Sequence, residues 1–179
     1  MKINKTFIED LLIFKPQLFK DDRGFFYESY NKNNLDINIV FVQDNESKSY
    51  KGVIRGLHFQ APPFEQTKLV RCVSGNILDV AVDLRYGSPT FLQWHAEMLC
   101  SQSNRMLIIP EGFAHGFQAL EANSELLYLH TNFYTPNAES GLRHDDPTLG
   151  IKWPEPFADL SIRDKNHSLL DAEFIGIKT

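Results

Sequence analysis

Arg55, His58 and Gln60 interrupt an otherwise apolar stretch, VIRGLHFQAPP, at residues 53–63. Histidine exchanges protons near neutral pH, so His58 is a candidate general base, the simpler alternative being a core histidine satisfied by a neighbour. Arg55 and His58 lie on opposite faces of a regular strand, but Gly56 permits a bulge that turns one of them. Because this polar set is costly in a core, we expect it to form a pocket wall.

A second histidine, His115, lies in PEGFAHGFQAL, where flanking glycines let the backbone approach a ligand closely. Two histidines in a β-rich chain suggest a metal site, which needs three or four converging ligands. Such sites commonly include two histidines at short spacing, whereas LHFQ has Phe59 and Gln60 after His58. We therefore predict a site without metal.

Three basic residues, Arg23, Arg55 and Lys68, each open or interrupt a strand-like segment. If they converge, they suit a diphosphate or a developing oxyanion; taken singly, each is an ordinary surface charge. Tyr128 is either a plain strand aromatic or a phenol that returns a proton to a carbanion. Asp164 is either a helix cap or a carboxylate that orients a histidine.

Short segments of alternating apolar and polar residues, separated by turn residues, must position these groups. The clearest spans 78–85, and Ser74-Gly75-Asn76 before it is typical of a hairpin turn that joins it to KLVRCV. About nine or ten such strands predict an all-β sandwich or barrel in one domain, residues 1–179. After Tyr134 we expect a long surface excursion with a turn of helix, and a short helix at 169–174. The other predicted strands are GFFYESY, IVFVQ, VIRGLHFQ, FLQWHAEMLC, RMLIIP, AHGFQAL and ELLYLHTNFY.

The composition narrows the class of protein. The chain has 179 residues and a net charge of −5, which argues against nucleic-acid binding because phosphate backbones require a basic face. The sequence has neither an N-terminal signal-peptide pattern nor an apolar run of membrane-spanning length, so we expect a cytoplasmic protein that does not contact a membrane. The two cysteines, Cys72 and Cys100, lack metal-type spacing and are expected to be small buried side chains.

The sequence resembles the nucleotide-sugar epimerases typified by dTDP-4-dehydrorhamnose 3,5-epimerase. The resemblance implies a cupin-type jelly roll (a double-stranded β-helix) with short C-terminal helical segments, a homodimer, and no metal or organic cofactor. It also implies an isomerase of dTDP-rhamnose biosynthesis, a pathway that supplies lipopolysaccharide O-antigen, with a nucleotide sugar as its partner. The matching motifs are DDRGFFYESY, FVQDN, VIRGLHFQ, KLVRCVSGNILDVAVDLRYGSPTF, IPEGFAHGFQAL, ELLY, DDPTLGIKWP and LSIRD.

By this resemblance His58 is the base that removes a proton beside the C4 ketone of dTDP-4-dehydro-6-deoxy-D-glucose, and Asp164 is its dyad partner. Lys68 stabilises the enolate oxygen, and Tyr128 returns a proton from the other side at C3 and C5. The expected substrate-binding residues are Arg23, Glu28, Gln43, Asp44, Asn45, Arg55, Gln60, Lys68, His115, Glu139 and Arg163.

Departures from the family pattern leave other functions open. LYLHTNFYTP differs after Tyr128 from typical 3,5-epimerases and looks more like enzymes that act at C3 or C5 alone. Arg163 replaces a frequent lysine, and Phe133 a frequent tyrosine. A jelly roll that binds a sugar nucleotide without catalysis and a metal-dependent oxygenase are the remaining alternatives, the latter disfavoured by the missing second histidine.

Overall fold

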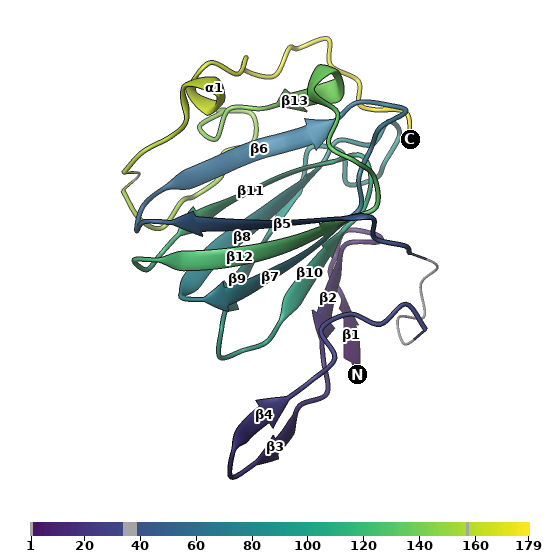
Figure 1. Cartoon of the computed structure of the whole chain (residues 1–179). Helices are drawn as coiled ribbons and strands as arrows, with labels where there is room; N and C mark the ends of the chain where they lie inside the picture. The colour runs from purple at the N-terminus through teal and green to yellow at the C-terminus, as the bar shows by residue number, and fades with distance from the viewer. Residues whose placement is uncertain (1, 34–38, 157) are drawn as a thin grey trace.

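The computed structural model describes residues 2–33, 39–156 and 158–179, and over these ranges the regular secondary structure is almost entirely β-strand. Two antiparallel sheets face each other and form a jelly roll (Figure 1). Sheet A runs in the order β1 (Lys2–Lys5), β2 (Leu12–Lys15), β10 (Met106–Ile109), β7 (Lys68–Ser74), β12 (Ser124–His130) and β5 (Gln43–Ser49). Sheet C runs in the order β13 (Glu139–Gly141), β6 (Ile54–Gln60), β11 (Phe113–Ala119), β8 (Asn76–Asp83) and β9 (Trp94–Cys100).

Side chains of strand β8 alternate between the two faces of sheet C. Val80 and Val82 pack on the outer face of sheet C beneath the chain that follows residue 141, whereas Ala81 joins the core between the sheets. Asp79, on the same face as Ala81, is fully buried and meets His115 there. The alternation predicted from the sequence is confirmed, and both faces of the strand are covered.

Three apolar clusters hold the layers together. The cluster between the sheets includes Val70 and Leu126 from sheet A and Phe117 from sheet C. A second cluster covers the outside of sheet C, and a third, with Tyr27 and Phe41 packed against it, covers the outside of sheet A. Truncating one of the fully buried large side chains to alanine costs ~2–5 kcal/mol, so these clusters fix the positions of the strands firmly.

The predicted hairpin at Ser74-Gly75-Asn76 is wrong, because β7 belongs to sheet A and β8 to sheet C. The turn carries the chain from one sheet to the other. Gly75 has φ +76°, and a Cβ there would lie 2.6 Å from the Ser124 hydroxyl oxygen, so the turn packs tightly on the start of β12.

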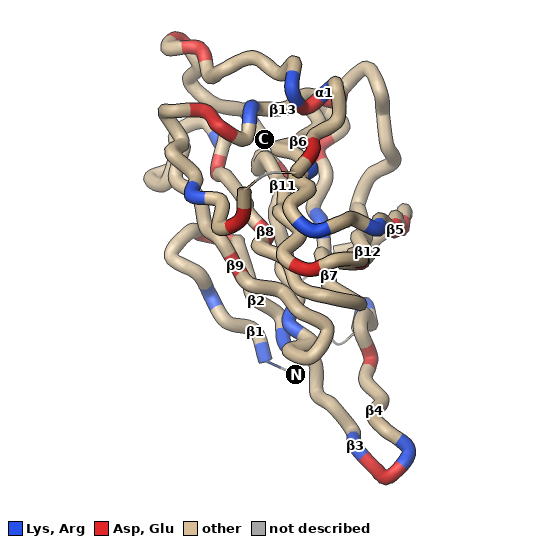
Figure 2. Tube along the Cα trace, turned by 90° about the vertical axis from the view of Figure 1, so that its left-hand side faces the viewer, with Lys and Arg blue, Asp and Glu red and all other residues tan. Residues whose placement is uncertain are grey.

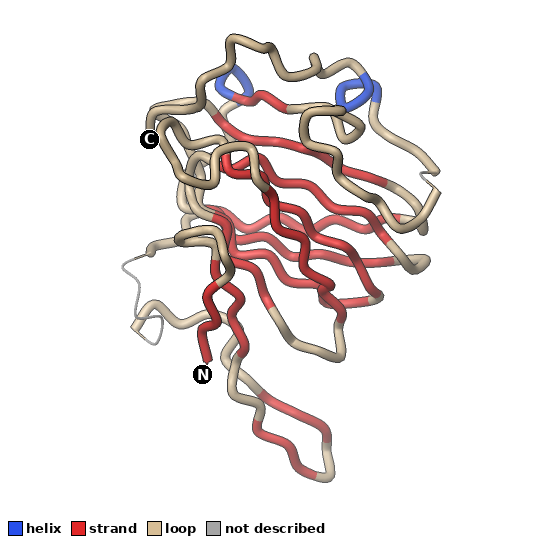
Figure 3. The backbone as a smooth tube through the Cα atoms, turned by 180° about the vertical axis from the view of Figure 1, so that it is seen from behind, coloured by secondary structure: helices blue, strands red, loops and turns tan. Residues whose placement is uncertain are grey.

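The helix predicted at residues 169–174 is also absent. The backbone N–H of Leu170 instead donates to Asp146 at 2.6 Å. Leu170 and Phe174 pack on the outer face of sheet C, and an irregular segment can bury these side chains there without forming a helix. The helical segments are instead η1 (Pro136–Ala138) and α1 (Ile162–Lys165), at the opposite end of the molecule from the N-terminus (Figures 1 and 3). None of the helices in the described ranges is long and apolar enough to cross a membrane.

A small hairpin, β3 (Phe19–Asp21) and β4 (Gly24–Phe26), projects from the body of the molecule (Figure 1). The predicted strand GFFYESY shrinks to β4, and IVFVQ contributes only Gln43, the first residue of β5. The hairpin leaves Phe19, Phe25 and Phe26 exposed and carries charged residues at its tip (Figure 2).

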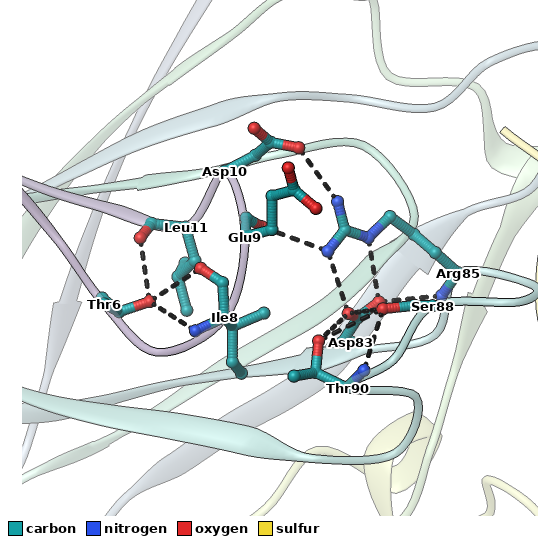
Figure 4. Close-up of polar contacts among 9 residues, drawn as sticks. All are labelled: Thr6, Ile8, Glu9, Asp10, Leu11, Asp83, Arg85, Ser88 and Thr90. Atoms are coloured by element: carbon teal, nitrogen blue, oxygen red, sulfur yellow. Dashed lines mark hydrogen bonds and ion pairs between the residues drawn. The ribbon is translucent and has the colours of Figure 1, made fainter.

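A buried polar network joins the start of the chain to sheet C (Figure 4). Asp83, fully buried, accepts hydrogen bonds from Arg85, Ser88 and Thr90 at 2.6–3.0 Å. Arg85 also donates to Asp10 at 3.2 Å and to the Glu9 carbonyl at 3.1 Å. Burial raises the pKa of Asp83, but the hydrogen bonds from Arg85, Ser88 and Thr90 outweigh it, and the net shift is downward.

Candidate active site

A bulge in β6 brings Arg55 and His58 to one cavity. In the pairing of β6 with β11, His58 lies opposite His115 and Arg55 opposite Phe117, so β6 has one extra residue between these pairs. Gly56 has φ +119°, and a Cβ on it would lie 2.6 Å from the Cα of Gly116. Arg55 and His58 both line the cavity, and the bulge expected at Gly56 is confirmed.

Asp164 holds the ring of His58. The Nε2 atom of His58 lies 2.7 Å from Oδ1 of Asp164, while Oδ2 accepts the backbone N–H of Gly56 at 3.3 Å. Ser161 caps α1 by accepting the backbone N–H of Asp164, which fixes the carboxylate at the start of the helix. Burial alone raises the pKa of Asp164, but the hydrogen bond and charge of His58 lower it overall to about 2. The carboxylate is therefore ionised at neutral pH.

Sheet A forms the opposite wall of the cavity. Across β5, β12 and β7 the register aligns Gln43, His130 and Lys68 in one row. The next row on the same face, two positions along, holds Asn45, Tyr128 and Val70. Because side chains alternate along a strand, residues 128 and 130 of β12 share the face toward sheet C. His58 and Tyr128 therefore stand on opposite walls.

Tyr128 and Lys68 are both perturbed by burial. Desolvation raises the pKa of the Tyr128 phenol to about 12, against a hydrogen bond with the Ser47 hydroxyl that lowers it. Desolvation lowers the pKa of the Lys68 ammonium to about 8, and the charges of Asp79 and Glu139 oppose that shift. At neutral pH the phenol keeps its proton and most of the ammonium stays charged.

The cavity between the two walls has a volume of about 860 Å³ and is open to solvent. That volume suits a ligand of moderate size. The expected site residues that line it are Gln43, Asp44, Asn45, Arg55, His58, Lys68, His115, Tyr128, Glu139, Arg163 and Asp164.

A histidine–carboxylate hydrogen bond and an ion pair organise the cavity wall around these groups. His115 is buried and its Nε2 lies 2.9 Å from Oδ2 of Asp79, which fixes the ring. Glu139 accepts the Tyr134 hydroxyl at 2.7 Å and Arg163 Nη1 at 2.5 Å, so residues from the η1 region and from α1 meet at the rim.

Three expected binding residues lie outside this cavity. Arg23 is at the tip of the β3–β4 hairpin, with its side chain 91% exposed and paired to Asp21, and Glu28 is exposed just beyond β4. Gln60 is buried, and its amide binds the backbone of Phe64, Phe133 and Thr135, so it holds two loops rather than the cavity wall.

Sequence reasoning missed two histidines near the site. His130 lines the cavity two positions after Tyr128, and strand alternation from Tyr128 was the signal that could have found it. His167 lies three residues after Asp164, with its ring 5.9 Å from that of His58. His58, Asp164 and His167 each offer a metal-capable atom, all within 4.8 Å of one another, and Arg163 adds a positive charge 3.8 Å from Asp164.

The arrangement can move a proton across a bound molecule. One wall carries the His58 imidazole, held by the Asp164 carboxylate. The other wall carries the protonated phenol of Tyr128 on β12 and the ammonium of Lys68 on the neighbouring strand β7. A base, an acid on the opposite face and a cation for a developing oxyanion are the groups needed to invert a carbon next to a ketone.

Comparisons with known proteins agree with this chemistry. A family profile described as dTDP-4-dehydrorhamnose 3,5-epimerase matches residues 5–172. The protein of that name from Salmonella typhimurium is 48% identical over 176 residues, covering 96% of each chain. A crystal structure of that epimerase from Bacillus anthracis, with TDP and PPi bound, aligns with TM-score 0.91 and 44% identity over 94% of this chain and 99% of that one. The Legionella pneumophila structure, in complex with dTDP-4-keto-L-rhamnose, aligns with TM-score 0.91 and 42% identity over 99% and 98%.

Proposed function

The chain belongs to the dTDP-4-dehydrorhamnose 3,5-epimerase family and is an isomerase, and we propose that the cavity between its sheets carries out the reaction with His58 as the base. The substrate is dTDP-4-dehydro-6-deoxy-D-glucose, and inversion at C3 and C5 gives dTDP-4-dehydro-L-rhamnose. The observation that supports this assignment best is the His58–Asp164 contact of 2.7 Å on the wall opposite Tyr128.

The first step is removal of the proton on the carbon beside the C4 ketone. With Nε2–H donating to Asp164, the Nδ1 lone pair of His58 accepts the proton. The C–H bonding pair forms the new C=C bond, and the C=O π pair moves to oxygen, giving an enolate. The ionised Asp164 stabilises the imidazolium that forms, because the opposite charges are adjacent in a buried site.

Two further groups complete the reaction, one that stabilises the enolate oxygen and one that protonates the carbon. The Lys68 ammonium stabilises the negative oxygen, and a charge-assisted contact of this kind strengthens as the charge develops. Tyr128 donates its phenolic proton to the opposite face of the carbon, where the C=C π pair forms the new C–H bond while a lone pair on oxygen reforms the C=O bond. Ser47, hydrogen-bonded to the phenol, is placed to stabilise the phenolate. Solvent then removes the proton from His58 and returns one to Tyr128, so each inversion exchanges a proton with water.

The remaining cavity residues suit a nucleoside diphosphate. Arg55, Arg163 and Lys68 supply positive charge, and Asn45 and Gln43 supply amides on the β5 side. We assign substrate contacts to Asp44, His115 and Glu139 as well. Gln60 is assigned an indirect role, since its amide holds the backbone at residues 133–135, beside Tyr134 in the rim.

Arg23 and Glu28 fit the proposal as contributions to a partner's site in a homodimer. The hairpin that carries Arg23 projects from the body of the molecule (Figure 1). It exposes three phenylalanines, which a second copy of the chain would bury. A C2 dimer would exchange the two hairpins reciprocally, each reaching the other subunit.

The proposal includes no metal and no organic cofactor, since proton transfer beside a ketone requires only an acid, a base and an oxyanion stabiliser. It also assigns the enzyme to the cytoplasm, in keeping with two cysteines that are both free. Neither nucleic acid nor a membrane is a partner.

The decisive experiment is solvent exchange. The purified protein is incubated with dTDP-4-keto-6-deoxyglucose in D2O, and deuterium at C3 and C5 is followed by mass and NMR together with the configuration of each carbon. Two labelled and inverted carbons support the proposal. One labelled and inverted carbon would establish a C3-only or C5-only epimerase, and binding without any exchange would establish a non-catalytic module.

A further inference from the structure

His130 lies in the middle of a row of polar side chains that crosses sheet A. The register pairs it with Gln43 of β5 on one side and with Lys68 of β7 on the other. All three residues line the cavity. Directly opposed residues on one face of antiparallel strands have Cβ atoms about 4.5–5.5 Å apart, so the His130 ring is the immediate neighbour of the Lys68 side chain.

The ring of His130 is buried yet incompletely satisfied. The residue is 6% exposed, and its Nδ1 atom is buried with no hydrogen-bond partner among the described residues. Leaving a buried polar atom unsatisfied is unfavourable, so such an atom calls for an explanation, and contact with a bound ligand is one. Nδ1 itself has almost no accessible surface, so it reaches a ligand only when the ring turns toward the cavity that His130 lines.

The surroundings of His130 identify which part of the ligand it meets. Its ring centroid is 6.2 Å from that of Tyr128, and Tyr128 lies 6.4 Å from the ring of His115. His130 is thus a neighbour both of the phenol assigned as the acid and of the ammonium assigned to the enolate oxygen. Burial, then the charges of Lys68 and His115, lower the pKa of His130 to about 4, against a weaker upward effect of the Tyr128 backbone. At neutral pH the ring is therefore uncharged and carries one N–H.

We propose that His130 is a substrate-contacting residue whose Nδ1–H donates to the C4 oxygen of the sugar beside Lys68, so that two donors stabilise the enolate. This inference rests on the proposed function, because it assigns the same oxyanion to a second group. A neutral donor suits this place, since a second cation next to Lys68 would be repelled by it.

Three substitutions test the role of Nδ1. In His130→Asn the side-chain amide falls near the position of Nδ1, in His130→Gln it reaches toward Nε2, and His130→Leu removes both ring nitrogens. We expect His130→Leu to lower kcat about a hundredfold or more with KM changed less than about threefold, as for loss of one oxyanion donor. His130→Asn is expected to recover most of kcat, and His130→Gln to stay low.

Leu129→Asn is the matched control, because Leu129 faces the outer cluster of the same strand rather than the cavity. It is expected to lower the melting temperature with kcat of the folded protein unchanged. If His130→Leu does not fold, the comparison of His130→Asn with His130→Gln decides: equal kcat values overturn the inference.

The outcomes also separate this inference from the proposed function. If the wild-type protein exchanges no deuterium into the 4-keto sugar, the proposed function itself fails. If the wild type exchanges and His130→Leu retains kcat within about threefold of it, only the role of His130 is overturned.

Discussion

His58 and Asp164 are 106 positions apart in the sequence, yet Nε2 of one lies 2.7 Å from Oδ1 of the other. Two local features produce this contact. The bulge at Gly56 turns His58 into the cavity, and the Ser161 cap holds Asp164 at the start of α1. The same carboxylate accepts the Gly56 backbone N–H, so the bulge and the dyad stabilise each other.

His58→Asn removes the proposed base while keeping a polar side chain of similar size. We expect kcat and deuterium exchange to fall together by ~10²–10⁴, the usual contribution of a general base. Asp164→Asn should lower kcat less, because the base remains. As a control, thermal unfolding curves should show that each variant is folded at the assay temperature. Retained exchange in folded His58→Asn protein would rule out His58 as the base.

Tyr128→Phe separates proton removal from proton return. Because His58 can still remove and return a proton on its own face, we expect solvent deuterium to enter the substrate while inversion falls by ~10²–10⁴. The measurement is the ratio of exchange to inversion in D2O, by NMR and mass. An unchanged ratio would assign the acid to another group.

The activity should depend on the protonation of Lys68. Its pKa is lowered to about 8 by burial, so the charged form that stabilises the enolate is lost as pH rises through that value. We expect kcat/KM to fall above about pH 8 in the free enzyme. Lys68→Arg, which stays charged, should have lower activity but no decline over this range. A decline that persists in Lys68→Arg would point to a different group.

Subunit mixing tests whether Arg23 acts in a partner's site. Arg23→Ala and His58→Asn proteins are each expected to have little activity. Randomly paired, half the dimers are mixed, and one site in each mixed dimer has both native residues, so activity should return to about one quarter of wild type. A mixture of His58→Asn with Lys68→Met, both cavity residues, should give none. No recovery in the first mixture would mean that the hairpin does not act on a partner.

Asp83 should contribute to stability in a pH-dependent way. Its pKa is lowered in the folded protein, so the stabilisation is present above its ordinary value of about 3.9 and is lost as pH falls below it. We expect Asp83→Asn to lower the free energy of unfolding by roughly 1–3 kcal/mol at pH 7, with the difference shrinking toward acid pH. Denaturant unfolding at several pH values measures this. Asp10→Asn, at the exposed end of the network, should change stability by less than about 1 kcal/mol.

The sequence was sufficient for the local features that depend on single residue types. Alternation in β8 predicted that strand, and Gly56 predicted the bulge that brings Arg55 and His58 together. The strand Gln43–Ser49 was missed because its composition is polar, which reflects the cavity it lines rather than an exposed loop.

The remaining errors concern relations between distant segments. A turn such as Ser74-Gly75-Asn76 has the same composition whether it joins two strands of one sheet or passes between sheets, so the hairpin could not be distinguished from the crossing. The hairpin with Arg23 presents a related limit. Arg23 matches a binding motif, yet it lies at the exposed tip of the hairpin and outside the cavity, because the motif carries no information about where the fold places the residue.

The pairing of β12 with β5 and β7 also limits how this enzyme can be altered. Tyr128 and His130 share a face because the strand has a two-residue period, so inserting or deleting one residue upstream in β12 would direct both side chains into the outer cluster at once. Replacing a residue in this strand changes one contact, whereas changing its length removes the whole wall. Segments 61–67 and 131–135 border the cavity without strand pairing of their own, and Gln66 and Tyr134 line it there. Those loops are where changes of length could reshape the substrate range without loss of the catalytic register.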